Sequence, residues 1–402
     1  MHSLNLRKMA VAMSLLYSFS AYSAWYEAEG EALITNGEIH EARQLAIRDA
    51  LTSIMYQGGA SIRALRVIEQ GVLEKKSLIV NTNGEIHDMR LLKESIEGSR
   101  IKVKVSADIS KLEKCISDNY AKTLFIGPIS LQKREHGQLG AIYSAPEEIS
   151  RRLFYRFKED SFQIDARYLR TRSIGFDNRY DQDIERKMLT VARDISSQYD
   201  VQYILFGKVN DMSSYNKSVI GPILLPTTVR LRNYQLKLYV IDGIKGLTVF
   251  RKNYDGVTEW PFDVTMKLDV TGNIFWASDY GIMIDKLINE ATKDVQEAIY
   301  CKASLATIVN VYEDKVIINL GQVNGLKKGD KFKLLQQQFL TEQIDNRVKP
   351  IFNSSEVEFT VIDVQSDRAV LATKNESMGN VQIRDILLPV NENYFDKTIY
   401  EY

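Results

Sequence analysis

The sequence predicts a multidomain protein that combines α+β and α/β architecture and ends in a small β-barrel. Three observations support this prediction. An alanine-rich helix follows an alternating strand near the start, a strand–helix–helix–strand pattern fills the middle, and short strands fill the last hundred or so residues. The expected boundaries are a signal peptide over 1–23, an α+β domain over 24–112, an α/β domain over 113–303 and a barrel domain over 304–402.

Residues 1–23 have the three regions of a secretory signal peptide. Arg7 and Lys8 form the positive start, Met9 to Phe19 the apolar stretch, and Ala21-Tyr22-Ser23 the small-x-small cleavage pattern. The alternative, a buried N-terminal helix, accounts for fewer of these features. The apolar run is too short to cross a bilayer, and no later stretch approaches the length needed. We therefore expect an exported, periplasmic protein without a membrane span.

Charge and composition exclude two classes of protein. Lysine plus arginine equals aspartate plus glutamate, at 52 each, and no basic stripe stands out. This balance lacks the electrostatic footprint of a nucleic-acid-binding protein. With 45% hydrophobic residues and only 7 prolines, the chain is expected to fold rather than remain disordered.

The first domain is predicted to be one helix on a small sheet. Strands are expected over Trp25 to Ile34 and over Ile101 to Ile109, with Leu91 to Ile96 as the hairpin partner of the latter. The helix, Ile39 to Leu51, has alanines that would let it lie close against the sheet. Its expected core face contains Ala42, Leu45, Ala46, Asp49 and Ala50.

The middle domain opens with a predicted buried strand, Lys122 to Ile129, which is expected to stop at Gly127-Pro128. Pro146 suits the first turn of the helix that follows, because a proline there loses no hydrogen bond. Apolar residues at helical spacing define this helix and a second one. They are Ile149, Leu153, Phe154 and Phe157 in the first, and Ile184, Met188, Val191, Ala192 and Ile195 in the second.

Three further strands and a helix complete the expected middle domain. A buried strand over Tyr199 to Val209 is followed by two long strands, Thr228 to Ile241 and Gly246 to Tyr254, joined around Asp242-Gly243. The stretch Ala192 to Lys208 resembles the N-terminal domain of the periplasmic protein TolB, which implies a TolB-N-like fold. The closing helix has an apolar face of Ile284, Leu287, Ile288, Ala291, Val295 and Ala298.

The only two cysteines, Cys115 and Cys301, lie just before the first strand and just after the last helix of the middle domain. In an exported protein, two cysteines are best explained by one disulfide bond. The bond would join residues 186 positions apart. In the chain-entropy model, closing a loop of this length stabilises the folded state by about 5 kcal/mol. The alternative is two separate buried thiols.

The last domain is predicted to contain short strands in a barrel. Ala306 to Tyr312 and Lys315 to Leu320 form a tight hairpin, while Glu356 to Val364 and Arg368 to Thr373 supply further strands. We predict a small SH3-like β-barrel, in which the glutamine-rich stretch Gln336 to Asn353 is a long solvated loop.

Two apolar segments of the middle domain are candidate contacts for partner proteins. The segment Ser213 to Thr227 is too apolar for an ordinary exposed loop, and Trp260-Pro-Phe262 is a second aromatic tip. The alternative is that both segments fold back onto their own core. The residues that would carry the contacts are Ile220, Ile223, Leu224, Leu225, Trp260 and Phe262.

Two stretches near the start, Trp25 to Ala32 and Glu41 to Ala50, resemble the opening of FlgT, the assembly protein of polar, sodium-driven flagella. The run Phe275 to Gly281 before the closing helix fits the same family, and the resemblance covers the whole chain. It implies a non-enzymatic structural component of the flagellar basal body that helps to form the H ring, a collar around the L and P rings.

The resemblance also implies partners for each domain. The N-terminal domain of the family supports attachment to the basal body and recruitment of the stator-linked T ring of MotX and MotY. The middle and C-terminal domains support the outer ring with FlgO and FlgP, and self-association in a ring is expected. The rival interpretation is a TolB-like periplasmic adaptor that binds a peptide or a peptidoglycan-associated protein.

Residues for catalysis or metal binding are not grouped in the sequence. His40, His87 and His136 fall on separate segments, and Arg179 stands where a calcium loop over Asp181 to Glu185 would need an oxygen ligand. No Gly-x-Ser-x-Gly elbow is present. We expect no cofactor, no metal and no enzymatic activity, with an exported hydrolase as the weaker third interpretation.

The regularly spaced glycines of the last domain are expected at turns rather than around a phosphate: Gly321, Gly325 and Gly329.

Overall fold

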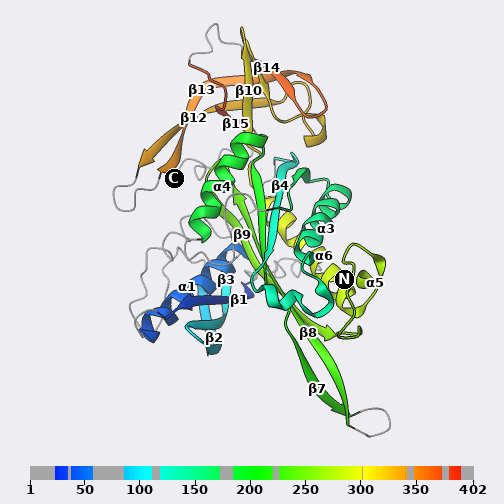
Figure 1. Cartoon of the computed structure of the whole chain (residues 1–402). Helices are drawn as coiled ribbons and strands as arrows, with labels where there is room; N and C mark the ends of the chain where they lie inside the picture. Colours follow the sequence, from blue (N-terminus) through cyan, green and yellow to red (C-terminus); the bar gives the residue numbers. More distant parts are fainter. Residues whose placement is uncertain are drawn as a thin grey trace, which may run out of the picture.

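A three-stranded sheet, a six-stranded mixed sheet and a closed barrel follow one another along the chain (Figure 1). The computed structural model describes residues 23–34, 38–57, 86–110, 118–172, 184–220, 226–300, 302–341, 348–373 and 380–390. Each of the three parts has its own cluster of buried apolar side chains. We refer to them as the N-terminal module, the central module and the barrel.

The N-terminal module is an antiparallel sheet in the order β1-β3-β2 with one helix on it. Its elements are β1 (Ser23–Leu33), α1 (Ile39–Gln57), β2 (Ile86–Glu97) and β3 (Arg100–Ser110). The expected strand pairing is present, and α1 runs beyond its predicted end. Ala42, Ala46 and Ala50 are buried as expected, whereas Leu45 is 39% exposed and does not belong to the core face.

Gly30 in β1 lies directly against the backbone of α1. A Cβ atom built on Gly30 would lie 2.0 Å from the carbonyl oxygen of Ala46 and 2.4 Å from the amide nitrogen of Ala50. The alanine face therefore brings the helix so close to the sheet that only a hydrogen fits at position 30.

The first half of the central module is parallel. Strand β4 pairs in parallel with both β5 and β6, and helices connect the three strands. The elements are β4 (Lys122–Leu131), α3 (Ala145–Asp160), β5 (Ile164–Leu169), α4 (Ile184–Tyr199) and β6 (Tyr203–Asp211).

The second half is antiparallel and is built on one long strand, β8. Strand β8 pairs with β6 and β7 along one edge and with β9 along the other. The elements are β7 (Ser214–Ile220), β8 (Pro226–Asp242), β9 (Leu247–Glu259), α5 (Asn273–Trp276) and α6 (Asp279–Tyr300). Helices α3 and α6 pack on one face of the sheet, and α4 packs on the other.

Three sequence expectations for the central module are wrong. Strand β4 continues past Gly127-Pro128 to Leu131, because its register on β6 shifts between Ile126 and Ile129. A proline is tolerated at such an irregularity, where no ladder hydrogen bond is required of it. Strand β5 was not predicted, and Tyr199 ends α4 instead of opening β6.

The barrel closes in the order β10-β11-β14-β13-β12-β15, with β10 paired to β15. Gly325 and Gly329 adopt the predicted positive φ at turns, whereas Gly321 is extended and lies against the backbone near Arg368. The strands are β10 (Ala306–Tyr312), β11 (Lys315–Ile318), β12 (Lys331–Thr341), β13 (Val348–Val364), β14 (Ala369–Thr373) and β15 (Ile386–Pro389).

The predicted solvated loop over Gln336 to Asn353 is wrong. Most of this stretch belongs to β12 and β13, which pair from Gln336↔Asn353 to Thr341↔Val348. The polar side chains concealed the strands, because a ribbon supported by backbone pairing needs no apolar alternation along its length.

We predict that Gly30→Ala selectively destabilises the N-terminal module, by about 2 kcal/mol, because the added methyl group overlaps a helix backbone that has no room to retreat. Hydrogen exchange followed by mass spectrometry should show faster exchange in α1 and β3 peptides. Gly272→Ala is the control, since the atom nearest to its added Cβ would lie at 3.4 Å. Equal exchange in the two variants would contradict the close approach.

Candidate interaction surfaces and domain junctions

Strands β7 and β8 form an arm that extends away from the central module, opposite the barrel (Figure 1). They pair continuously from Ser214↔Arg232 to Ile220↔Pro226. The apolar segment predicted as a candidate contact is therefore largely a β-hairpin. Ile220 is the last residue of β7, and Ile223, Leu224 and Leu225 lie outside the described residues.

The arm is exposed along β7. Tyr215 is 45% exposed, and the side chains of Asn216 to Ser218 are also exposed. Within the described ranges, β7 pairs only with β8, so the backbone groups on its outer edge face away from the sheet. Such an edge can accept a further strand.

Arg232 fixes the base of the arm. Its side chain is fully buried, and its guanidinium donates hydrogen bonds to the carbonyl oxygens of Met212 (3.1 Å), Leu139 (3.0 Å) and His136 (2.6 Å). The guanidinium also lies 4.2 Å from the ring centroid of Trp260, a cation–π contact. These bonds join β8 to the short turns η1 (Arg134–Gly137) and η2 (Leu139–Ala141).

Trp260 and Phe262 lie in this base rather than on an exposed tip. Trp260 is 3% exposed and packs edge-on against Phe262 at 5.1 Å and Tyr280 at 5.5 Å. Phe262 is partly buried against the same core. The alternative in which this segment folds back onto its own domain is thus the one that the structure shows, and Trp260 presents almost no surface to a partner.

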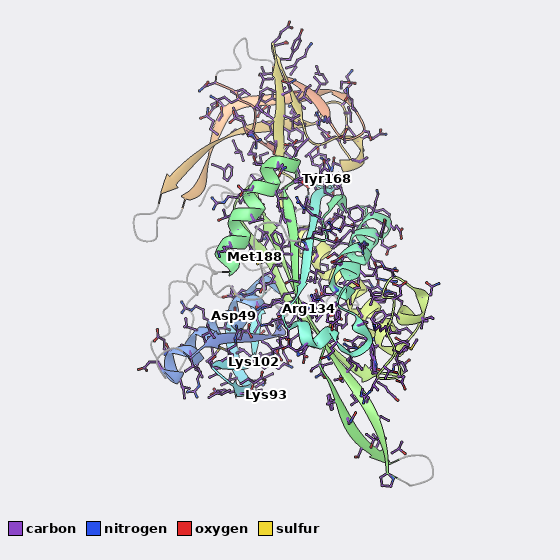
Figure 2. All side chains as sticks on the ribbon, in the orientation of Figure 1. Asp49, Lys93, Lys102, Arg134, Tyr168 and Met188 are labelled. Atoms are coloured by element: carbon purple, nitrogen blue, oxygen red, sulfur yellow. The ribbon has the colours of Figure 1, made fainter. Side chains whose placement is uncertain are left out.

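Asp49 of α1 connects the N-terminal module to the central sheet. One of its carboxylate oxygens pairs with the Arg251 guanidinium of β9 at 2.8 Å, and Arg251 also donates to the main-chain oxygen of Asp49. The other oxygen accepts the backbone N–H of Glu31 at 3.1 Å. Asp49 is labelled in Figure 2, where the N-terminal module approaches the sheet.

The charge of Asp49 is stabilised by its neighbours. Burial alone would raise the pKa of this carboxyl, but Arg251 and Lys237 outweigh burial and lower it. The sequence placed Asp49 on the apolar face of its helix without identifying a partner. An acidic residue within an apolar helix face indicates that a buried cation lies nearby. Nothing in the sequence identifies Arg251 as that cation.

A buried polar cluster joins the central module to the barrel. Lys122 of β4 donates to Asp118 at 2.5 Å and to the Ser304 hydroxyl at 2.7 Å, and Asp118 also accepts the backbone N–H of Ser304 at 2.5 Å. The side chains of Lys122 and Asp118 are 1% exposed. Residues 186 positions apart are thus locked together at the junction.

Two amides and a small apolar cluster extend this junction. Gln202 donates to Asp242 and to the Ala303 carbonyl, both at 3.0 Å, and accepts from the Leu305 amide at 3.0 Å. Asn324 of the barrel donates to the Ala121 carbonyl at 3.1 Å. The apolar contacts are made by Ile244, Leu305, Leu335, Phe352, Ile386 and Leu388.

The residues that the structure describes contain no cluster of histidine, cysteine, aspartate or glutamate able to hold a metal ion. The described helices also lack the combination of length and hydropathy that a membrane span requires. Cys115, Cys301 and the segment Asp181 to Asp183 lie outside the described residues.

We predict that Asp49→Asn weakens the contact between α1 and β9 by about 2 kcal/mol, because the ion pair with Arg251 is lost while the bond to the main-chain oxygen remains. The Asp49 pKa is depressed in the folded protein, so its stabilisation is complete above the ordinary aspartate pKa of about 4 and is lost as the pH falls through the folded value. Thermal unfolding midpoints should differ between wild type and variant at pH 7 and converge in acid. The exposed Glu159→Gln is the control, and a difference that persists unchanged in acid would contradict this role.

Solved structures match the chain at low identity and low TM-score. The hypothetical protein CT253 from Chlamydia trachomatis is 10% identical, with 45% of this chain and 98% of that chain covered and a TM-score of 0.29. The PelC dodecamer from Paraburkholderia phytofirmans is 10% identical, with 52% and 98% covered and a TM-score of 0.26. The lipoprotein GNA1162 from Neisseria meningitidis is 8% identical, with 43% and 99% covered and a TM-score of 0.20. No curated protein sequence matches the chain.

Three domains of one protein family match consecutive parts of the chain. The N-terminal domain of flagellar assembly protein T matches residues 24–111, its middle domain residues 113–270, and its C-terminal domain residues 313–389. The three matches keep the order of the family and include parts of all three modules. The chain therefore belongs to the FlgT family of flagellar assembly proteins.

Proposed function

We propose that this protein is a periplasmic, non-enzymatic component of the flagellar basal body and that it helps to build the H ring. The observation that supports this function is the match to all three FlgT domains in order. The proposed domain boundaries remain 24–112, 113–303 and 304–402, with a TolB-N-like middle fold and an SH3-like barrel.

Each module has a proposed role. The N-terminal module attaches the protein to the basal body near the L and P rings and supports the T ring of MotX and MotY. The central module and the barrel support the outer ring with FlgO and FlgP, and copies of the chain associate in a ring. The polar junctions around Asp49 and Asp118 favour this role, because modules held by specific hydrogen bonds keep a fixed relative orientation under load.

The arm is the surface that we propose for contact between neighbouring copies. An isolated two-stranded ribbon is only marginally stable in water, so an arm of this kind gains from a partner along its open edge. The exposed Tyr215 would contribute to the contact.

The rival function, a TolB-like adaptor, receives less support. A propeller after the middle domain would have favoured it, and the described part of the C-terminal region instead forms a closed six-stranded barrel.

We predict a disulfide bond between Cys115 and Cys301. Asp118 and Ser304, each three residues beyond a cysteine, are hydrogen-bonded to one another, and three residues of chain span at most about 10 Å. Mass mapping of unreduced protein taken from the periplasm should detect the linked peptides. Replacing both cysteines with serine should lower the thermal midpoint of the central module, and two free thiols in the native protein would refute the bond.

We predict that deleting residues 24–110 leaves an exported and folded protein that fails to attach to the basal body. The deletion removes the Asp49 contact but leaves the Asp118 cluster and the barrel intact. Protease resistance of residues 118–390 should persist, whereas swimming in soft agar and the collar seen by electron microscopy should be lost. The full-length gene supplied to the same deletion strain is the control. Normal swimming with a folded truncated protein would contradict the role given to the N-terminal module.

A further inference from the structure

Four polar residues form a row across four strands of the central sheet. Ser130 of β4 is opposite Lys208 of β6, Lys208 is opposite Lys237 of β8, and Lys237 is opposite Asn253 of β9. Residues in register on neighbouring strands share a face of the sheet. The residues beside this row in sequence, such as Gly207 and Leu238, belong to the opposite face, which packs against α3 and α6.

The row lies on the face that carries α4 and the N-terminal module, and it is covered. Lys208 and Lys237 are each 8% exposed. Lys237 is within 3.8 Å of Asp49 of α1, which places this part of the row beneath the N-terminal module. Two lysines directly opposite one another on the same buried face repel each other, so the arrangement needs a compensating group.

The nearby carboxylates compensate only one of the two lysines. Burial lowers the pKa of Lys237, but the charge of Asp49 outweighs burial and raises it. Asp49 already pairs with Arg251 at 2.8 Å and accepts a hydrogen bond from the Glu31 amide. Its distance to the Lys237 ammonium, 3.8 Å, is longer than its distance to Arg251. Lys208 forms no hydrogen bond or ion pair within the part of the chain that the structure describes, although nine-tenths of its surface is buried. Burial lowers the pKa of Lys208, with Glu31 only partly opposing this effect.

Both ends of the row are also unsatisfied. The Ser130 hydroxyl and the Asn253 side-chain oxygen are buried without a hydrogen-bond partner. A serine hydroxyl can donate, and the asparagine amide presents an N–H group if its oxygen and nitrogen are exchanged. Two ammonium groups, a hydroxyl and an amide are therefore all available as donors on one buried face.

We propose that this row is a binding site for a small tetrahedral oxyanion of the phosphate or sulfate type, held chiefly by Lys208 and Lys237. Such an anion has several acceptor oxygens and can neutralise two opposed ammonium groups at once, whereas a water molecule supplies no charge and a metal cation would add to the repulsion. Because the N-terminal module covers the row, the bound anion also strengthens the docking of that module on the central sheet.

The experiment measures thermal unfolding and calorimetric binding of the full-length protein with sodium phosphate, sulfate, acetate or chloride at equal ionic strength. Phosphate and sulfate should raise the unfolding midpoint in a saturable way, with one anion per chain. Lys208→Met should weaken the binding at least tenfold. Lys217→Met, on the exposed arm, is the matched control and should leave the binding unchanged.

Three outcomes overturn the proposal. No response to any anion would mean that water alone fills the row, and an equal response to acetate would assign it to a carboxylate instead. An unchanged response in Lys208→Met would place the anion elsewhere. If Lys208→Met does not fold, Ser130→Ala serves in its place: it should reduce the affinity several-fold, and a phosphate affinity equal to that of the wild type would overturn the site.

Discussion

The backbone pairing of β8 is the interaction on which the rest of the structure depends. Its 17 residues pair with β6 and β7 on one side and with β9 on the other. Along the same strand lie Arg232 at the base of the arm, Lys237 near the N-terminal module and Asp242 at the junction with the barrel. A single unbroken strand therefore sets the positions of the arm and of both junctions.

The two junctions use different chemistry. The junction with the N-terminal module rests on charged groups around Asp49, whereas the junction with the barrel combines the buried Asp118 cluster with apolar contacts. Buried ion pairs add little net stability compared with apolar packing, but removing one partner is costly. Such groups therefore fix orientation more than they add affinity, which suits modules that must keep one arrangement.

Periodicity in the sequence was enough to predict α3, α4, α6 and the two long strands, because these elements bury one regular face against a single core. It could not predict β5, a short edge strand, or the ribbon of β12 and β13, whose glutamines carry no apolar alternation. The contacts at the two junctions could not be predicted from the sequence either. Asp49 and Arg251 are 202 residues apart, and no local pattern relates one to the other.

The arm and the central sheet are parts of one strand, and this has a mechanical consequence. A pull on the arm along the direction of β8 acts parallel to the strand, so the ladders to β6 and β9 are loaded in shear and their hydrogen bonds resist together. A pull across the sheet would instead open the bonds one after another. With Arg232 clamping the point where the arm leaves the module, the fold is stiff in the direction along which the arm projects and compliant in the direction across it.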